Sequence, residues 1–75
     1  MMDMDEDLKK EIRERLIALR TENGLSQTEV GKIVGKSKTA VASWEQGLSM
    51  PDIVTLKRLA LYYHKTMNFM YGDEE

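Results

Sequence analysis

A segment near the middle of the chain, QTEVGKIVGKSKTAVASWEQ at residues 27–46, constrains the fold more than any other part of it. It predicts two short helices, 27–34 and 38–46, because Ser26 and Ser37 are suited to cap their N-termini and Gly35 breaks the pattern between them. The apolar residues are spaced so that each helix buries one face, and they are Val30, Ile33, Val34, Val41 and Trp44. The segment therefore predicts a closely packed helical pair joined by a tight turn.

Three more helices are predicted from apolar periodicity and capping residues. The first runs from about Asp5 to Glu22, with a buried stripe at Leu8, Ile12, Leu16 and Leu19. The fourth has Pro51 in its first turn, ends at about Tyr63, and turns inward Ile53, Leu56, Leu59, Ala60 and Tyr63. Thr66 caps a short fifth helix through Met70 or Tyr71, and no pattern predicts a strand. The expected fold is all-α, with five helices in a single domain spanning residues 1–75.

Composition excludes several classes of protein and site. The 75 residues contain no cysteine, and the single histidine, His64, cannot form a zinc site alone. The N-terminus, MMDMDEDLKK, is acidic and has no signal-peptide pattern, and no stretch approaches the roughly 20 apolar residues that span a bilayer. We therefore expect a soluble, cytoplasmic protein that needs no membrane, metal or cofactor.

Charge is distributed unevenly along the chain. The net charge is −2, but seven of the thirteen acids lie in residues 1–7 and 73–75, which we expect to be flexible ends. Residues 8–72 contain all eleven basic residues and only six acids, a net charge of +5. Salt limits the reach of the acidic ends to about 8–10 Å, so the basic body is compatible with phosphate contacts. The same charges could instead serve only solubility.

The second helix of the central pair has an outer face of short polar side chains. At about 100° per residue, Val41 and Trp44 share one side, and the opposite side carries Thr39, Ala42, Ser43 and Gln46. A helix with small polar side chains beside lysines suits a DNA major groove.

Landmarks spread over several helices resemble the helix-turn-helix family of phage Cro proteins and lambda-type repressors, the XRE-type regulators. The matching residues cover roughly 12 to 71 and are Leu19-Arg20, Gly24-Leu25-Ser26-Gln27, Gly35, Trp44-Glu45, Gly47, Pro51 and Leu59-Ala60. The resemblance implies a lambda-repressor-like domain that binds double-stranded operator DNA, usually as a homodimer, and regulates transcription, here most simply as a repressor. Whether the chain stands alone or belongs to a longer regulator is left open.

Roles for individual residues follow from both sources: the resemblance implies those of Lys38, Thr39, Ser43, Gln27, Arg20 and Glu45, and the helix faces and the free amides at the start of the second helix add the others. The expected base-contacting residues are Lys38, Thr39, Ala42 and Ser43. The expected phosphate-contacting residues are Gln27, Thr28, Lys32, Lys36 and Gln46. Arg20 and Glu45 are expected to form a structural ion pair between the first and third helices. Gly31 stands where alanine is common in the family, and either residue is expected to let the two helices cross closely.

Apolar residues near the C-terminus suggest a dimer interface. If the inward positions of the last two helices are as predicted, the exposed residues are Leu61, Tyr62, Phe69 and Tyr71. Four large side chains so close together could form one patch, or Tyr62, Phe69 and Tyr71 could fold back over a small core.

Other functions have weaker support. No nucleophile and base are placed recognisably together, so an enzyme is not expected. The spacing of Asp3, Asp5, Asp7 and Glu14 faintly resembles a calcium loop, but Leu8 occupies the position that needs glycine. The alternative function is a protein-interaction module of the same fold, for example an antitoxin-like subunit, with a protein as its main partner.

Overall fold

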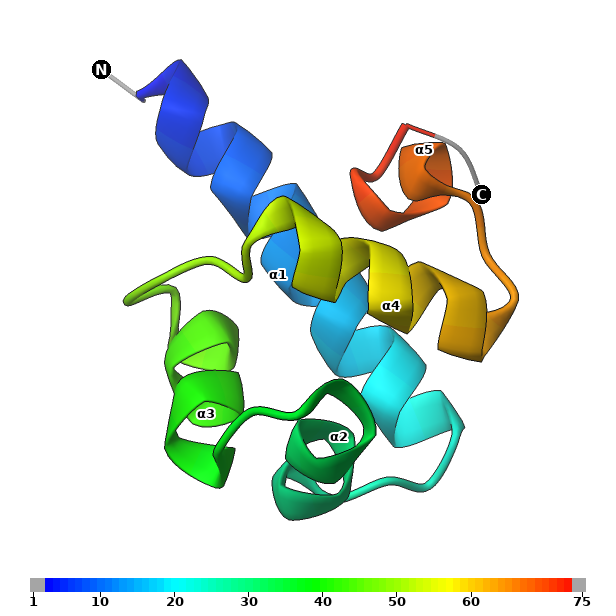
Figure 1. Ribbon diagram of the computed structural model, residues 1–75. Helices are drawn as coiled ribbons and strands as arrows, with labels where there is room; N and C mark the ends of the chain where they lie inside the picture. Colours follow the sequence, from blue (N-terminus) through cyan, green and yellow to red (C-terminus); the bar gives the residue numbers. More distant parts are fainter. Residues whose placement is uncertain (1–2, 74–75) are drawn as a thin grey trace.

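Five helices form the whole ordered architecture of residues 3–73, the part of the chain that the computed structural model describes (Figure 1). They are α1 (Met4–Glu22), α2 (Gln27–Val34), α3 (Lys38–Gln46), α4 (Ile53–Tyr63) and α5 (Met67–Met70). The all-α prediction is confirmed. None of these helices is both long and apolar enough to cross a membrane.

Each helix begins at a side chain that caps it. Asp3, Ser26, Ser37, Asp52 and Thr66 each accept a hydrogen bond from a backbone amide in the first turn of α1 to α5, respectively. The N-cap of α4 corrects one prediction, because Asp52 ends the preceding loop and Pro51 lies outside the helix. The acids Asp5, Glu6 and Asp7 form the first turn of α1, so this part of the expected flexible end is helical. The remaining end residues, 1–2 and 74–75, lie outside the described range.

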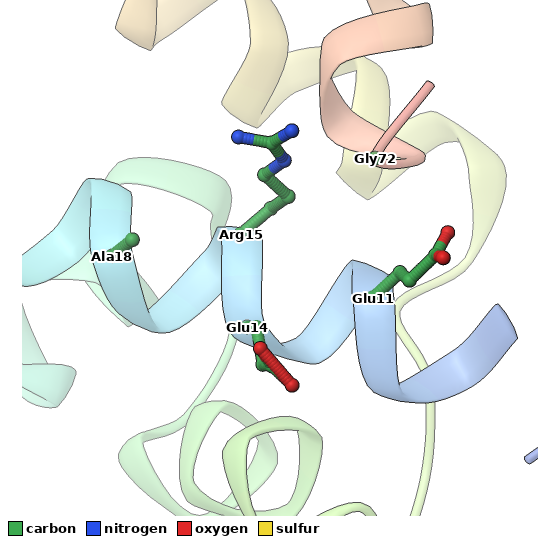
Figure 2. Close-up of a pocket in the computed structure, with 5 residues that line it drawn as sticks. All are labelled: Glu11, Glu14, Arg15, Ala18 and Gly72. Atoms are coloured by element: carbon green, nitrogen blue, oxygen red, sulfur yellow. The ribbon is translucent and has the colours of Figure 1, made fainter. Parts of the chain in front are cut away.

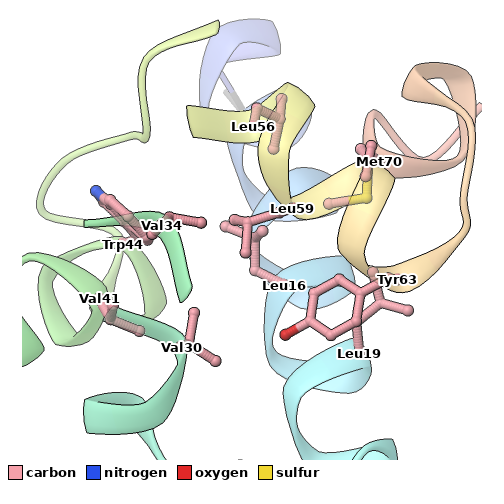
Figure 3. Close-up of a cluster of buried hydrophobic side chains, with 11 residues drawn as sticks. Leu16, Leu19, Val30, Val34, Val41, Trp44, Leu56, Leu59, Tyr63 and Met70 are labelled. Carbon is pink, nitrogen blue, oxygen red and sulfur yellow. The ribbon is translucent and has the colours of Figure 1, made fainter. Parts of the chain in front are cut away.

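Side chains from all five helices meet in one apolar core (Figure 3). Its members are Leu16, Leu19, Val30, Val34, Val41, Trp44, Leu56, Leu59, Ala60, Tyr63 and Met70. Trp44 is a core residue, as its alignment with Val41 predicted. Burial raises the pKa of Tyr63 to about 12, so its phenol stays neutral within the core.

Two residues predicted to face the core are exposed instead. Leu8 lies on the predicted stripe of α1 but is exposed, because the first turns of α1 extend beyond the helices that cover the rest of it (Figure 1). Ile53 is exposed because it is the first residue of α4, whose inward face begins at Thr55 and Leu56. In both cases the residue lies on the face that the periodicity predicted, but the core ends before it.

The turn between α2 and α3 depends on a close approach at Gly31. A Cβ atom at this position would lie 2.5 Å from the carbonyl oxygen of Lys36, which is backbone and cannot swing aside. The amide of Lys36 also donates to the carbonyl of Gly31 at 2.8 Å, which holds the turn against the helix. The expectation that alanine would serve equally well here is therefore wrong.

We expect Gly31→Ala to destabilise the domain by about 1–3 kcal/mol, the usual cost of inserting a methyl group into a packed site. Alanine favours helix by up to about 1 kcal/mol over glycine, so the clash must exceed that gain for the expected sign to appear. Urea unfolding followed by circular dichroism measures the difference, with Lys32→Ala as an exposed control on the same helix. A Gly31→Ala protein as stable as the wild type would contradict the close approach.

Candidate nucleic-acid interface

The outer face of α3 is open at its N-terminal end. Lys38 and Thr39 in its first turn are exposed, and Gln46 in its last turn is exposed as well. Ala42 and Ser43, between them, are half-buried. The inner face packs Val41 and Trp44 into the core, so α3 is fixed with its short polar side chains turned outward. The structure thus brings the four predicted base-contacting residues onto one surface.

Ser43 is joined to a residue that the sequence did not single out. Its hydroxyl oxygen lies 2.7 Å from that of Ser49, in the loop between α3 and α4. This contact places Ser49 beside the outer face of α3 and orients the Ser43 hydroxyl. Helical periodicity could not reveal Ser49, because the loop that returns it toward α3 has no repeating pattern.

The N-terminus of α2 is built by a reciprocal capping box. The Ser26 hydroxyl accepts from the amide of Glu29 at 3.1 Å, and the Glu29 carboxylate accepts from the amide of Ser26 at 3.0 Å. The hydrogen bond from the Ser26 amide is the main reason that the pKa of Glu29 is lowered, and it turns the carboxylate back onto the cap. The amides of Gln27 and Thr28, in the same turn, have no partner within the helix by virtue of their position. Such a helix start favours an anion.

An ion pair links α1 to α3, as the resemblance implied. The Arg20 guanidinium donates to both oxygens of the Glu45 carboxylate, with Nε 2.6 Å from Oε2 and Nη2 2.9 Å from Oε1. Only 19% of the Arg20 side chain and 9% of the Glu45 side chain are exposed. The hydrogen bonds to Glu45 raise the pKa of Arg20 against the opposing effect of burial. The ion pair is therefore bidentate and largely buried.

The same ion pair reaches α2 and the connection before it. Arg20 Nη1 donates to the carbonyl of Leu25 at 3.0 Å. Glu45 Oε1 accepts from the Gln27 side-chain amide at 3.1 Å, which leaves the carbonyl oxygen of that amide to accept from another group. Gln27 was predicted as a phosphate contact, and the Arg20–Glu45 pair as a structural ion pair. The structure connects the two predictions, because Glu45 positions the Gln27 side chain.

The two lysines expected at phosphates differ in their surroundings. Lys32 is exposed on the last turn of α2. Lys36 is also exposed, and its Nζ lies 3.7 Å from Oδ2 of Asp52. The pKa of Asp52 is lowered, chiefly because its carboxylate accepts from the amide of Thr55 and only secondarily by Lys36. Contact with a phosphate would require Lys36 to turn from Asp52.

Two arginines of α1 contact other parts of the fold. The guanidinium of Arg13 lies against Gly47, where any Cβ atom would collide with it. Arg15 lies over the ring of Phe69, with Cζ 4.4 Å from the ring centroid, and Lys65 lies near the same ring, with Nζ 4.6 Å from the centroid. These contacts hold α5 and the end of α3 against α1.

The predicted dimer patch is only partly present. Leu61 and Tyr62 are exposed on α4, as predicted. Phe69 and Tyr71 are half-buried and pack against the core, Phe69 between the cations of Arg15 and Lys65. The expectation of four exposed side chains is therefore wrong for these two, which fold back as the alternative interpretation proposed.

A hollow of about 380 Å³ lies between α1 and the end of α5 (Figure 2). It is lined by Glu11, Glu14, Arg15, Ala18 and Gly72. Its cation, Arg15, is already placed over Phe69. Nothing in its lining resembles the polar surface on α2 and α3, which remains the candidate site.

Comparisons with known proteins agree with this geometry. Residues 16–69 match the family described as helix-turn-helix. The chain is 31% identical over 65 residues to the HTH-type transcriptional activator BcrR of Enterococcus faecalis, covering 87% of this chain and 32% of the relative. It is 34% identical over 55 residues to the ImmF control region 10 kDa protein of Bacillus phage phi105, covering 73% and 61%. The chain thus spans about a third of the first relative and three fifths of the second.

A solved structure also resembles the fold. The P22 c2 repressor, crystallised in complex with the synthetic operator 9T, superposes with a TM-score of 0.76 at 25% identity. The alignment covers 84% of this chain and 96% of that chain. The arrangement of five helices is therefore the lambda-repressor-like one.

We expect Arg20→Ala to lower the free energy of unfolding by about 3 kcal/mol, near the lower end of the cost of orphaning one partner of a buried pair. The reason is that Glu45 would keep a largely buried charge with only the Gln27 amide to stabilise it. Chemical denaturation measures the loss. Lys10→Ala is the matched control, since it breaks the exposed pair to Glu14 and should change stability by less than about 1 kcal/mol. Equal stability of the two variants would show that the Arg20 pair is not buried in solution.

Proposed function

We propose that this chain, which belongs to the helix-turn-helix family of DNA-binding transcription regulators, binds operator DNA by placing the outer face of α3 in the major groove. The observation that carries the proposal is the orientation of α3, whose apolar face is locked into the core while Lys38, Thr39 and Ser43 face outward. The likeness to the P22 c2 repressor, which was crystallised on an operator, supports the same assignment.

The side chains on this face suit direct reading of base edges. Lys38 can donate to the O6 and N7 atoms of guanine, and the methyl group of Ala42 can contact a thymine methyl. Thr39 and Ser43 can bond to a base or a phosphate. Because Ser49 holds the Ser43 hydroxyl, we add Ser49 to the proposed contact surface as the residue that orients Ser43.

Phosphate contacts would position the domain on the duplex without reading sequence. We assign them to the amides of Gln27 and Thr28, together with Lys32, Lys36 and Gln46. The Gln27 side-chain amide donates to Glu45, and this bond fixes the orientation in which Gln27 would meet the DNA backbone. The helix start of α2 and the exposed face of α3 would then contact the same DNA from two sides of the turn.

We further propose that the protein acts in the cytoplasm as a homodimeric repressor. A two-fold dimer would bring two α3 helices to half-sites about 34–36 Å apart on one face of the DNA. The competing proposal is an antitoxin-like module whose main partner is a protein. It is supported by the exposed apolar side chains of α4, which could bind such a partner.

Gel-shift titration with DNA from around its own gene distinguishes these functions. A regulator should bind one fragment at least about a thousandfold more tightly than unrelated DNA, with affinity falling as salt rises. Absent or salt-insensitive binding to every fragment, together with co-purification of a stoichiometric protein, would overturn the DNA-binding proposal.

We expect Thr39→Ala and Ser43→Ala each to relax base preference at one position of the operator. The loss of a single base contact should cost about 1–3 kcal/mol for the preferred base. Selection from a randomised operator library measures the preference of each variant, with Lys10→Ala on α1 as the control that should leave it unchanged. Unchanged preference in both α3 variants would place the base-reading surface elsewhere.

For Lys32 and Lys36 we expect weaker binding to all sequences alike. Each lysine that neutralises one phosphate should reduce the slope of log affinity against log salt by about 1 when it is replaced by alanine. Fluorescence anisotropy at several salt concentrations gives the slope, again with Lys10→Ala as the matched loss of one positive charge. An unaltered slope in the double variant would remove both lysines from the interface.

A further inference from the structure

The outer face of α4 presents an apolar stripe with a basic side chain on each side. Val54 and Leu61 lie seven residues apart and share one side of the helix, and they are 59% and 63% exposed. At about 100° per residue, Lys57 borders this stripe on one side and Arg58 on the other. The helix carries no acid. Within residues 3–73, no other segment packs over this face.

The start of α1 presents the complementary pattern. Met4 and Leu8, four residues apart, form an apolar stripe on turns that extend past the body of the domain, and they are 74% and 51% exposed (Figure 1). Asp7 and Glu11 border this stripe on one side and Asp5 on the other. The stripe continues the half-buried Ile12 and the buried Leu16, so it is a core-facing surface that its own chain leaves uncovered.

We propose that the first two turns of α1 of one copy pack onto the outer face of α4 of a second copy. The apolar stripe of α1, flanked by acidic side chains, would then meet the apolar stripe of α4, flanked by basic side chains. The contact would bury apolar surface and pair opposite charges. Such a contact leaves α2 and α3 free, so it goes beyond the proposed DNA binding and can join copies on or off the operator.

A second copy is favoured over other occupants by charge and geometry. Packing α4 against α4 of another copy would place Lys57 and Arg58 beside their own counterparts, and like charges at a contact are destabilising. The α1 of the same chain cannot cover this face, because it lies on the core side of α4. A two-fold arrangement would form the α1–α4 contact twice and so double the buried area, which a single short helix end could not supply alone.

Sedimentation velocity of the full chain without DNA tests the contact through a charge exchange. The Asp5→Lys, Asp7→Lys variant and the Lys57→Glu, Arg58→Glu variant should each weaken self-association about tenfold or more, because each places like charges across the interface. The four substitutions combined in one chain should restore most of the association, since opposite charges then face each other again on both sides of the stripe. The Lys32→Glu, Lys36→Glu variant makes the same charge change as the α4 variant and should leave association unchanged.

The apolar part of the contact has its own test. Leu61→Glu should abolish association, because its carboxylate would lie among Asp5, Asp7 and Glu11, whereas Leu61→Lys should weaken it less. Circular dichroism confirms that each variant is folded, which the exposure of these residues leads us to expect. A wild-type protein that remains monomeric at all concentrations, or a charge exchange that fails to restore association, would overturn the proposal. Either result would leave the DNA-binding proposal standing, since no DNA is present.

Discussion

The Arg20 guanidinium ties three segments of this fold together: α1, the connection before α2, and the end of α3. Through its nitrogens it holds Glu45 at the end of α3 and the carbonyl of Leu25 before α2, and through Glu45 it reaches the Gln27 amide. The position of the helical pair relative to α1 therefore depends on one planar group with fixed donor directions. Lysine, with one nitrogen, could not make these bonds together.

A polar connection of this kind complements the small apolar core. Eleven buried apolar side chains from five helices fill the centre, but such contacts have no direction and tolerate small shifts of one helix against another. A bidentate ion pair tolerates much less displacement, because both of its hydrogen bonds must stay aligned. We infer that burial supplies most of the stability, and that Arg20 and Glu45 specify the angle at which α3 presents its outer face.

Close approach at Gly31 completes this arrangement. The carbonyl of Lys36 occupies the space that a side chain at Gly31 would need, so the turn folds tightly onto α2. Gly35 then adopts a positive φ of 71°, which ends α2 and redirects the chain toward the Ser37 cap. The N-terminus of α2 and the outer face of α3 thereby come to adjacent positions, where one stretch of duplex could contact both.

Features with a local pattern could be predicted from the sequence. Apart from the start of α4, helix bounds followed from caps and glycines to within about one residue, and the burial of Trp44 followed from its spacing to Val41. The ends of the core could not be predicted, because the apolar periodicity of a helix continues beyond the part that other helices cover. Leu8 and Ile53 follow the periodicity and are nevertheless exposed. Nor could contacts between segments without a pattern, such as Ser43 with Ser49 and Phe69 between two cations, since they arise only when a loop or a short helix has been placed in three dimensions.

An NMR titration of nitrogen-15-labelled protein with the tightest-binding duplex tests most directly that α2 and α3 form a DNA-binding surface. We predict that the largest changes in amide chemical shift occur at Gln27 and Thr28 and along residues 38–43. The α5 amides, which lie on the far side of the core, should change little (Figure 1). Largest changes on α4 and α5, with α3 unaffected, would contradict the account.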